Sequence, residues 1–198
     1  MSLSGLLDDV SRCEICQSHL PLGPRPLLRI ESAARLVIIG QAPGRLAHQS
    51  GIPWNDPSGD RLRDWLGISR EEFYRHPALA IMPMGFCFPG TGRGGDLAPR
   101  PECASTWHAA LLAEMPRLET TLLIGRYAQN TYLDGTKRSV TAAVKTWAET
   151  FPRLLPLPHP SPRNNRWLKQ NPWFEIEVLP ALRRKVAEML SDHTGTDP

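Results

Sequence analysis

"RLVIIGQAPG", residues 35–44, is an apolar run that ends at a glycine and continues at once into a loop with a proline and a second glycine. Three further short apolar runs cover residues 78–86, 120–125 and 153–159. Short runs bounded by Gly or Pro are typical of buried strands. Segments with helical spacing lie between or beside them, at residues 60–67, 69–76, 101–115 and 139–150. Because strands alternate with helices, the pattern predicts an α/β fold with a parallel sheet covered on both faces.

The chain has 198 residues, of which 41% are hydrophobic, so it is long enough to bury one core. We therefore expect a single domain over residues 1–198. Residues 171–190 read as a closing helix that is interrupted near Pro180, because proline lacks the N–H that a helix interior uses. Residues 191–198 read as a frayed tail.

The basic residues are mostly arginine, 19 of 23, although the net charge is only +3. Arginine suits forked contact with phosphate, which points toward a nucleic-acid partner, and ordinary solubilising surface charge is the alternative. There is no apolar run of membrane-spanning length, and Asp8 and Asp9 interrupt the N-terminal segment. We expect a cytoplasmic protein that does not contact a membrane. In a reducing compartment the four cysteines are then buried thiols, metal ligands or catalysts rather than disulfides.

Glycine and proline are concentrated in two loops that follow strands, residues 40–59 and 83–101. Long loops at the carboxyl ends of parallel strands commonly bind ligands. A third loop, "LPHPSPRNNRWL" at residues 157–168, places His159 between Pro158 and Pro160. The two prolines restrict the backbone, so the imidazole is held in advance of any reaction. The alternative is a structural histidine without chemistry.

"GQAPG" at residues 40–44 and "HPSPRN" at residues 159–164 together resemble the two signature loops of the uracil-DNA glycosylase superfamily. The resemblance extends over about residues 13–170. It implies a three-layer αβα sandwich with a central four-stranded parallel sheet. It also implies that the chain is a DNA-repair glycosylase. Such an enzyme hydrolyses the N-glycosidic bond of uracil or a related deaminated base in single-stranded or duplex DNA, after extruding the nucleotide.

The same resemblance assigns roles at the strand ends. His159 would donate a hydrogen bond to the departing base. Many members carry Asp or Asn at the position of Ala42 to hold the attacking water, and the iron-sulfur branch has Glu at the position of Gln41. Asp56 is the nearest carboxylate that can orient water, with Gln41 assisting, although it equally fits a helix N-cap. Base-binding positions are Gly40, Ala42 and Trp54, of which Trp54 stacks on the base or is a core aromatic.

Residues 161–169 are implied to face DNA. Two apolar side chains there, Trp167 and Leu168, would fill the gap left by the flipped nucleotide. Arg166 and Lys169 would contact the DNA backbone. The alternative is that both lie on a solvated helix start. The predicted DNA-binding residues are Ser161, Arg163, Asn164 and Arg166.

The cysteines form a CxxC pair, Cys13 and Cys16, and a distant pair, Cys87 and Cys103, separated by the residues 88–102. These intervals resemble the cluster ligands of the iron-sulfur branch. Four thiolates suit a [4Fe-4S] cluster or tetrahedral zinc, and residue types alone do not separate the two. The resemblance favours the iron-sulfur cluster, and two incidental thiol pairs with no metal are the alternative.

The loop after Cys87 departs from the iron-sulfur branch. Gly92 stands where that branch has an Asn that reads the base edge, while Arg93 is kept, and Asp96 either reads an edge or serves a turn. The excised base is therefore open between uracil, hypoxanthine and xanthine. A DNA-binding relative with little or no glycosylase activity is the alternative function, and an unrelated metal-dependent hydrolase or redox protein is a third. We expect a monomer.

Overall fold

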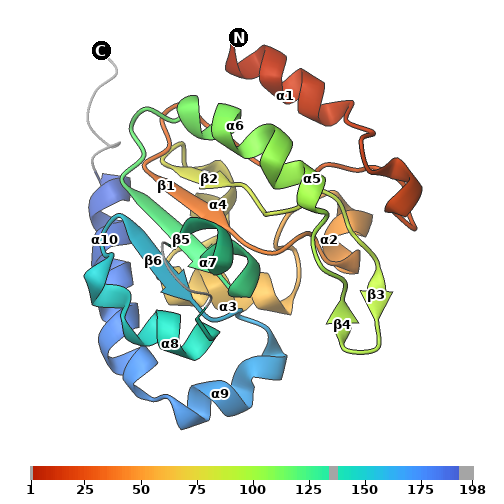
Figure 1. Cartoon of the computed structure of the whole chain (residues 1–198). Coiled ribbons are helices and arrows are strands. Elements are labelled where there is room, and N and C mark those ends of the chain that lie inside the picture. The colour runs from red at the N-terminus through yellow and green to blue at the C-terminus, as the bar shows by residue number, and fades with distance from the viewer. Residues whose placement is uncertain (1, 134–137, 192–198) are drawn as a thin grey trace, which may run out of the picture.

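The computed structural model describes residues 2–133 and 138–191. Its centre is a four-stranded sheet in the order β2-β1-β5-β6, in which every neighbouring pair is parallel. The strands are β1 (Leu36–Ile39), β2 (Leu79–Ile81), β5 (Thr120–Ile124) and β6 (Leu154–Leu157). The predicted four-stranded parallel sheet is thus confirmed (Figure 1).

Two hydrophobic layers cover the sheet, because alternate residues of each strand point to opposite faces. Leu36 and Ile38 pack with α3 (Pro57–Leu66), α4 (Arg70–Arg75) and the closing helix α10 (Leu179–Ser191). Val37 and Ile39 pack on the other face with α1 (Leu3–Ser11), α6 (Ala109–Ala113) and α7 (Arg126–Tyr132). The predicted three-layer αβα sandwich is confirmed, with α6 and α10 on opposite sides of the sheet (Figure 1).

The second strand is shorter than its apolar run, which extends over residues 78–86. β2 ends at Ile81, and Pro83, which has no N–H to donate, follows two residues later. Residues 82–86 remain buried and continue beside β1, since the N–H groups of Met82 and Met84 donate to the carbonyls of Ile38 and Gly40. The apolar run therefore combines a strand with a buried connection toward the first loop.

The predicted helices are present with different limits. Residues 60–67 belong to α3, which begins earlier because Asp56 caps it and Pro57 occupies its first turn. Residues 69–76 contain α4 behind a Ser69–Glu72 capping box. Residues 101–115 form one helical run: α5 (Pro101–Cys103), a π-turn (Ala104–His108) and α6. Residues 139–150 form α8 (Val140–Lys145) and a 3₁₀ turn (Trp147–Glu149).

The closing helix changes its winding near Pro180, as predicted. A π-turn (Phe174–Val178) precedes α10, and the change falls where proline cannot donate a backbone hydrogen bond. The helix includes Ser191, so the tail predicted from residue 191 begins too early, and residues 192–198 lie outside the described part of the chain. Among the described residues, no helix combines the length and apolar character needed to cross a bilayer.

Several short elements have no strong sequence pattern and were not predicted. They are α1, a 3₁₀ turn (Gln17–His19), α2 (Arg45–Ser50), α7, a 3₁₀ turn (Pro162–Asn164) and an antiparallel hairpin of β3 (Thr91–Gly92) with β4 (Gly95–Asp96). A further short helix, α9 (Asn165–Gln170), lies where the sequence offered a solvated helix start as an alternative. The hairpin projects beside the carboxyl ends of the parallel strands (Figure 1). These ends meet at one edge of the sheet, where the loops after β1, β2 and β6 come together.

Candidate active site

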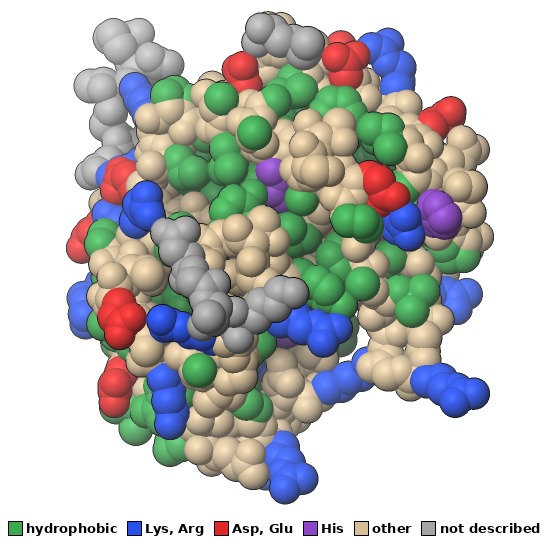
Figure 2. Space-filling model, in the orientation of Figure 1, with side chains coloured by type: hydrophobic (Ala, Val, Ile, Leu, Met, Phe, Trp, Pro, Cys, Tyr) green, Lys and Arg blue, Asp and Glu red, His purple; other side chains and the backbone are tan. Residues whose placement is uncertain are grey.

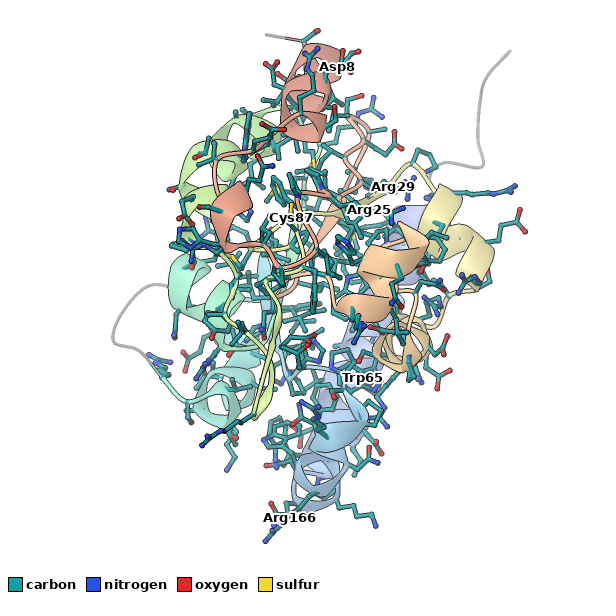
Figure 3. The ribbon with its side chains drawn as sticks, turned by 90° about the vertical axis from the view of Figure 1, so that its right-hand side faces the viewer. Asp8, Arg25, Arg29, Trp65, Cys87 and Arg166 are labelled. Carbon is teal, nitrogen blue, oxygen red and sulfur yellow. The ribbon has the colours of Figure 1, made fainter. Side chains whose placement is uncertain are left out.

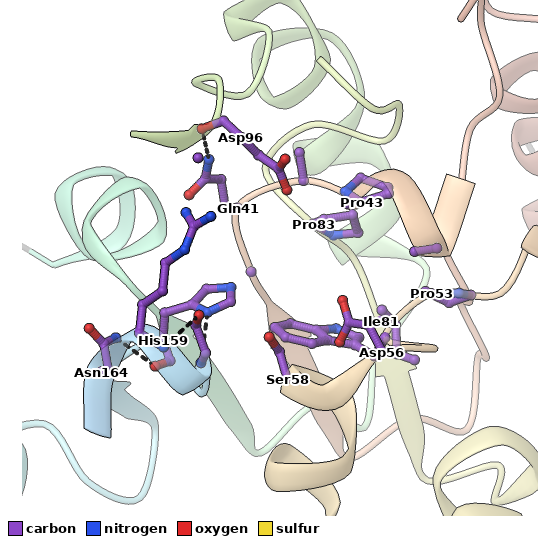
Figure 4. A pocket seen from close by; sticks show the side chains of 18 of the residues that line it. Gln41, Pro43, Pro53, Asp56, Ser58, Ile81, Pro83, Asp96, His159 and Asn164 are labelled. Carbon is purple, nitrogen blue, oxygen red and sulfur yellow. Dashed lines mark hydrogen bonds between the residues drawn. The ribbon is translucent and has the colours of Figure 1, made fainter. Parts of the chain in front are cut away.

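A cavity of about 410 Å³ lies at this edge of the sheet. Its wall is formed by residues 40–44 and 53–58 after β1, by the hairpin residues 94–96 and by the loop after β6 that carries His159. Polar side chains enter from several sides: Gln41 and Asp96 lie close together on one, His159 on a second and Asp56 on a third (Figure 4). The sheet thus brings together the two loops that were singled out in the sequence.

His159 is held in one protonation form by its own loop. The backbone N–H of Ser161 donates to Nδ1 at 3.2 Å, so that nitrogen carries no proton. The side chain of Asn164 donates to the His159 carbonyl at 2.7 Å and fixes the backbone at the same point. Burial lowers the pKa of His159, and the nearby carboxylates of Asp56 and Asp96 oppose this in part. The ring is therefore a neutral imidazole that carries its proton on Nε2.

Trp54 lies beside this imidazole, with the two ring centroids 5.7 Å apart. Its backbone is left-handed (φ 58°), which is unusual for a large side chain and costs free energy. A Cβ on Gly40 would lie 2.7 Å from Cζ2 of Trp54, so only glycine lets the indole approach the strand end this closely. Trp54 also contacts the hydrophobic core, and it therefore has both a core face and a cavity face.

Gln41 uses its amide N–H groups within the protein. Nε2 donates to the carbonyl of Leu97 at 2.8 Å and approaches that of Asp96 at 3.5 Å. The side-chain oxygen is then the group that Gln41 can offer to a water. Ala42 lines the cavity without any polar side-chain atom, so the position supplies no water-binding group.

Asp56 serves as the N-cap of α3. Its Oδ1 accepts the N–H of Gly59 at 2.8 Å, which supports the structural reading of this residue. Its other oxygen faces the cavity near Gly44, where a Cβ would lie 3.9 Å from Oδ2. One carboxylate can thus cap the helix and still accept a proton or a hydrogen bond from a ligand.

The loop predicted to face DNA makes mainly internal contacts. Ser161 lines the cavity and accepts the N–H of Arg163, whose guanidinium donates to the carbonyl of Gly94 at 3.0 Å. Arg163 thus connects this loop to the hairpin. Arg166 is exposed on α9, as is Lys169, in agreement with the solvated-helix reading.

The wedge of Trp167 and Leu168 stays a prediction, and in the structure both side chains pack within the protein. Both side chains are partly buried against the core, and Trp167 packs edge-on to Phe174 and donates to the hydroxyl of Thr141 at 2.8 Å. A side chain that is held by such contacts cannot enter a DNA stack without giving them up. The sequence does not show this because Thr141 and Phe174 lie in other elements.

A second cavity of about 360 Å³ adjoins the first and shares Gln41, Asp96, His159 and Asn164 with it. Its other wall is built by the N-terminal end of α7 and by Thr141 and Trp167. Arg126 lies there with its guanidinium carbon 4.7 Å from the ring centroid of Tyr127. His159 therefore lines both cavities, the first together with hairpin residues 94–96 and the second together with the start of α7.

A family model described as the uracil DNA glycosylase superfamily matches residues 29–183. The chain belongs to this superfamily. The match includes the whole parallel sheet and all three loops of the first cavity. Superfamily members act on DNA, so membership supports a DNA-glycosylase role and DNA as the partner.

The four cysteines lie in one region of this superfamily member, away from the imidazole. Cys16 and Cys87 share a small buried cluster with Leu20, and Cys13, Cys16 and Cys87 all lie near enough to Cys103 to add to the rise in its pKa that burial causes. Burial raises the pKa of Cys87 to about 11 and that of Cys103 to about 12. In Figure 3, Cys87 lies beside Arg25, and Arg166 lies at the far end of the molecule.

The donor set of this region fits a thiolate-bound metal by type. The backbone N–H of Arg25 donates to Sγ of Cys87 at 3.3 Å, a contact of the kind that stabilises a metal-bound sulfur. Within the described part of the chain, however, no three His, Cys, Asp or Glu side chains are arranged closely enough to hold an ion. The side chains would have to close around a common centre, so the [4Fe-4S] cluster stays a prediction.

Two arginines that support the glycosylase loops were missed by sequence reasoning. Arg61 on α3 donates to the carbonyl of Ser161 at 3.0 Å and to Oδ1 of Asn165 at 2.7 Å. Arg63 is buried and donates to the carbonyl of Trp54 at 3.3 Å. For Arg63, the only sequence signal of a structural role is an arginine at a buried position of a helix. The sequence gives no such signal for Arg61.

Proposed function

We propose that the chain is a DNA N-glycosylase that hydrolyses the bond between deoxyribose and uracil or a related deaminated base. One observation carries this proposal: a neutral imidazole directs Nε2–H into a cavity next to the indole of Trp54. A flat aromatic face and a fixed neutral donor are what an extruded base needs when it leaves as an anion.

The departing base would lie against Trp54 with a carbonyl oxygen toward His159. As the C1′–N bond breaks, its electron pair moves into the base and negative charge develops on that oxygen. The Nε2–H of His159 then donates a stronger hydrogen bond than in the ground state. A preorganised donor of this kind contributes about 3 to 4 kcal/mol to the transition state. The base anion finally takes a proton from solvent.

Water would approach C1′ from the side of Asp56. The free Oδ2 of Asp56 accepts one proton of this water while the water oxygen bonds to C1′, and the oxygen of Gln41 orients it. The negative charge of Asp56 would also stabilise the positive charge that develops on the sugar. Asp56 and Gln41 together would thus do what an Asp or Asn does in the members that carry one at the position of Ala42.

The chemistry is tested with purified protein and oligonucleotides that contain one uracil or hypoxanthine, in single-stranded and duplex form, followed by alkali. We expect strand cleavage that is lost in His159→Ala and retained in His19→Ala, which removes an exposed histidine outside both cavities. Equal cleavage by wild type and His159→Ala would reject His159 as the donor.

The role of Asp56 requires a pair of variants, because the same side chain caps α3. Asparagine is an equally good N-cap but a poor proton acceptor, whereas alanine removes both properties. We expect Asp56→Asn to keep the stability of the wild type and to lose about 100-fold or more in rate. If Asp56→Asn is fully active and only Asp56→Ala is impaired, the carboxylate acts as a cap alone.

A DNA-binding relative with little glycosylase activity is the second candidate, and Ala42 favours it. The position that usually holds the attacking water offers only a methyl group to the cavity. Binding of oligonucleotides without cleavage of any lesion in the same assay would support this function.

We also propose that Cys13, Cys16, Cys87 and Cys103 bind a [4Fe-4S] cluster. The support is the four-thiol donor set and the N–H that Arg25 directs at Cys87. Once bound, such a cluster would neutralise the thiolates and tie the N-terminal segment to the loop after β2. A brown protein with iron and sulfide in equal amounts is expected, and Cys103→Ser should lose both. A colourless protein that contains zinc would support the alternative metal.

A further inference from the structure

The hairpin β3–β4 is fastened over the first cavity by two of its loops. Arg163, from the loop after β6, donates to the carbonyl of Gly94 at the hairpin turn, and a Cβ on Gly95 would lie 2.1 Å from its Nη1. Gln41, from the loop after β1, donates to the carbonyl of Leu97 at the end of the hairpin. A residue on β4 therefore has a fixed position relative to His159 and Gln41.

Asp96, the last residue of β4, directs its carboxylate into this cavity (Figure 4). Oδ1 accepts the hydroxyl of Thr91 at 3.3 Å. Oδ2 faces the first loop, where a Cβ on Gly44 would lie 3.2 Å away. Within residues 2–133 and 138–191, no Lys or Arg forms an ion pair with Asp96. One oxygen is thus held by the hairpin, and the other is free for a ligand.

An ionised carboxylate accepts hydrogen bonds but cannot donate them. It stabilises a base that turns an N–H toward it, and it repels a carbonyl oxygen in the same place. In uracil the ring N3–H lies between two carbonyl groups, so an acceptor near it also meets carbonyl oxygen. In hypoxanthine the N1–H has a carbonyl on one side and a C–H on the other. Xanthine N3–H likewise has one flank without a carbonyl.

We propose that Asp96 is a specificity-determining residue of this site and that it favours a deaminated purine over uracil. The proposal rests on the proposed glycosylase function and adds the substrate class. Asp96 acts from the wall of the cavity that the hairpin forms, while His159 acts on the leaving group from the opposite loop. Its free Oδ2 accepts the ring N–H of the purine at the flank that lacks a carbonyl.

The variant Asp96→Asn tests this with almost no change in shape. Its amide can still accept the Thr91 hydroxyl, but it also brings two N–H donors. With uracil the amide can accept N3–H and donate to O4 at the same time, so the penalty against uracil disappears. Asp8→Asn is the matched control, because Asp8 is an exposed carboxylate on α1, remote from the hairpin.

The measured quantity is the ratio of single-turnover excision rates for hypoxanthine and uracil in the same single-stranded oligonucleotide. We expect a ratio above one for the wild type and for Asp8→Asn, and a fall of about tenfold or more in Asp96→Asn. An unchanged ratio in Asp96→Asn, or a wild type that prefers uracil, overturns the proposal while the glycosylase function stands.

A second readout does not depend on catalysis. Free hypoxanthine and free uracil are titrated into wild type and Asp96→Asn, and their dissociation constants are compared by NMR. If no oligonucleotide is cleaved but the preference for free hypoxanthine falls in Asp96→Asn, the glycosylase function fails and the role of Asp96 is upheld. If neither free base binds to the wild type, the role of Asp96 is rejected.

Discussion

At the scale of single residues, the site depends on groups whose state is set by their backbone surroundings. His159 illustrates this, because the N–H of Ser161 occupies Nδ1 and leaves Nε2 as the donor. A protonated imidazole would carry hydrogen on both nitrogens and would lose the Ser161 contact. The loop therefore opposes protonation in addition to the burial that lowers the pKa of the ring.

This state predicts a pH dependence of stability. In the folded protein the pKa of His159 lies below 6.5, the ordinary value that applies to the unfolded chain. At a pH between the folded and the unfolded pKa, the unfolded chain therefore binds more protons than the folded protein. The free energy of unfolding must then fall as the pH drops through this range. We expect a steeper fall in wild type than in His159→Gln, measured by urea unfolding from about pH 7 to about pH 5. His48 and His108, whose pKa values are also lowered, contribute equally to both proteins. An NMR spectrum with the proton on Nδ1 would contradict the assignment.

Gly40 gives a second prediction at this scale. A methyl group there would overlap the indole of Trp54, with Cβ 2.7 Å from Cζ2. We expect Gly40→Ala to displace the ring, to slow excision by about 100-fold and to lower the free energy of unfolding by about 1 to 3 kcal/mol. Gly94→Ala is the control for an added methyl group on the wall of the same cavity, since its Cβ would have no neighbour within 4 Å and its carbonyl can still accept from Arg163. Wild-type rates in Gly40→Ala would show that the indole position does not matter for the reaction.

At the scale of elements, α3 holds two loops of the first cavity in place, residues 53–58 and the loop after β6. Its N-terminus is capped by Asp56, and Arg61 in its second turn reaches across to the loop after β6. A short helix thus connects the two signature loops, which are about a hundred residues apart in the chain.

Removal of this link should change the rate more than the affinity. Arg61 holds the carbonyl of Ser161, the residue whose N–H orients the imidazole. We expect Arg61→Ala to lower kcat about tenfold with little change in KM, because the donor is less well oriented in the transition state. Arg75→Ala, which removes an exposed arginine of α4, should leave both constants unchanged. A rise in KM alone would assign Arg61 to DNA binding.

The elements that sequence reasoning found are those with a strong pattern. The four apolar runs became the four strands, and "GQAPG" and "HPSPRN" met at one cavity because the carboxyl ends of parallel strands share an edge. The hairpin was missed because β3 and β4 contain only two residues each and present no apolar face. The internal contacts of Trp167 were not foreseen because its partners Thr141 and Phe174 come from other elements. A local sequence pattern does not predict contacts between residues that lie far apart in the chain.

At the scale of the whole molecule, charge is distributed unevenly over the surface. Lys and Arg side chains gather along the lower part of the face in Figure 2, around the hollow beside the hairpin. Asp and Glu lie mostly toward the left and the top of the same face. The net charge of +3 therefore understates the field that a DNA strand would meet at the cavities.

Arg126 tests whether the second cavity lies on the path of DNA. It is exposed at the start of α7, and it lines this cavity together with His159. If its guanidinium contacts a phosphate, Arg126→Ala should weaken binding to all single-stranded oligonucleotides alike, with or without a lesion. The slope of log K against log salt should also become smaller by about 0.7, since one counterion fewer is released when this contact is lost.

Arg12→Ala is the control, because Arg12 is an exposed arginine just after α1. It should leave both the affinity and the slope unchanged. Fluorescence anisotropy at several salt concentrations measures both quantities. An unchanged slope in Arg126→Ala would mean that Arg126 contacts no phosphate. The DNA backbone would then lie outside the cavity next to α7.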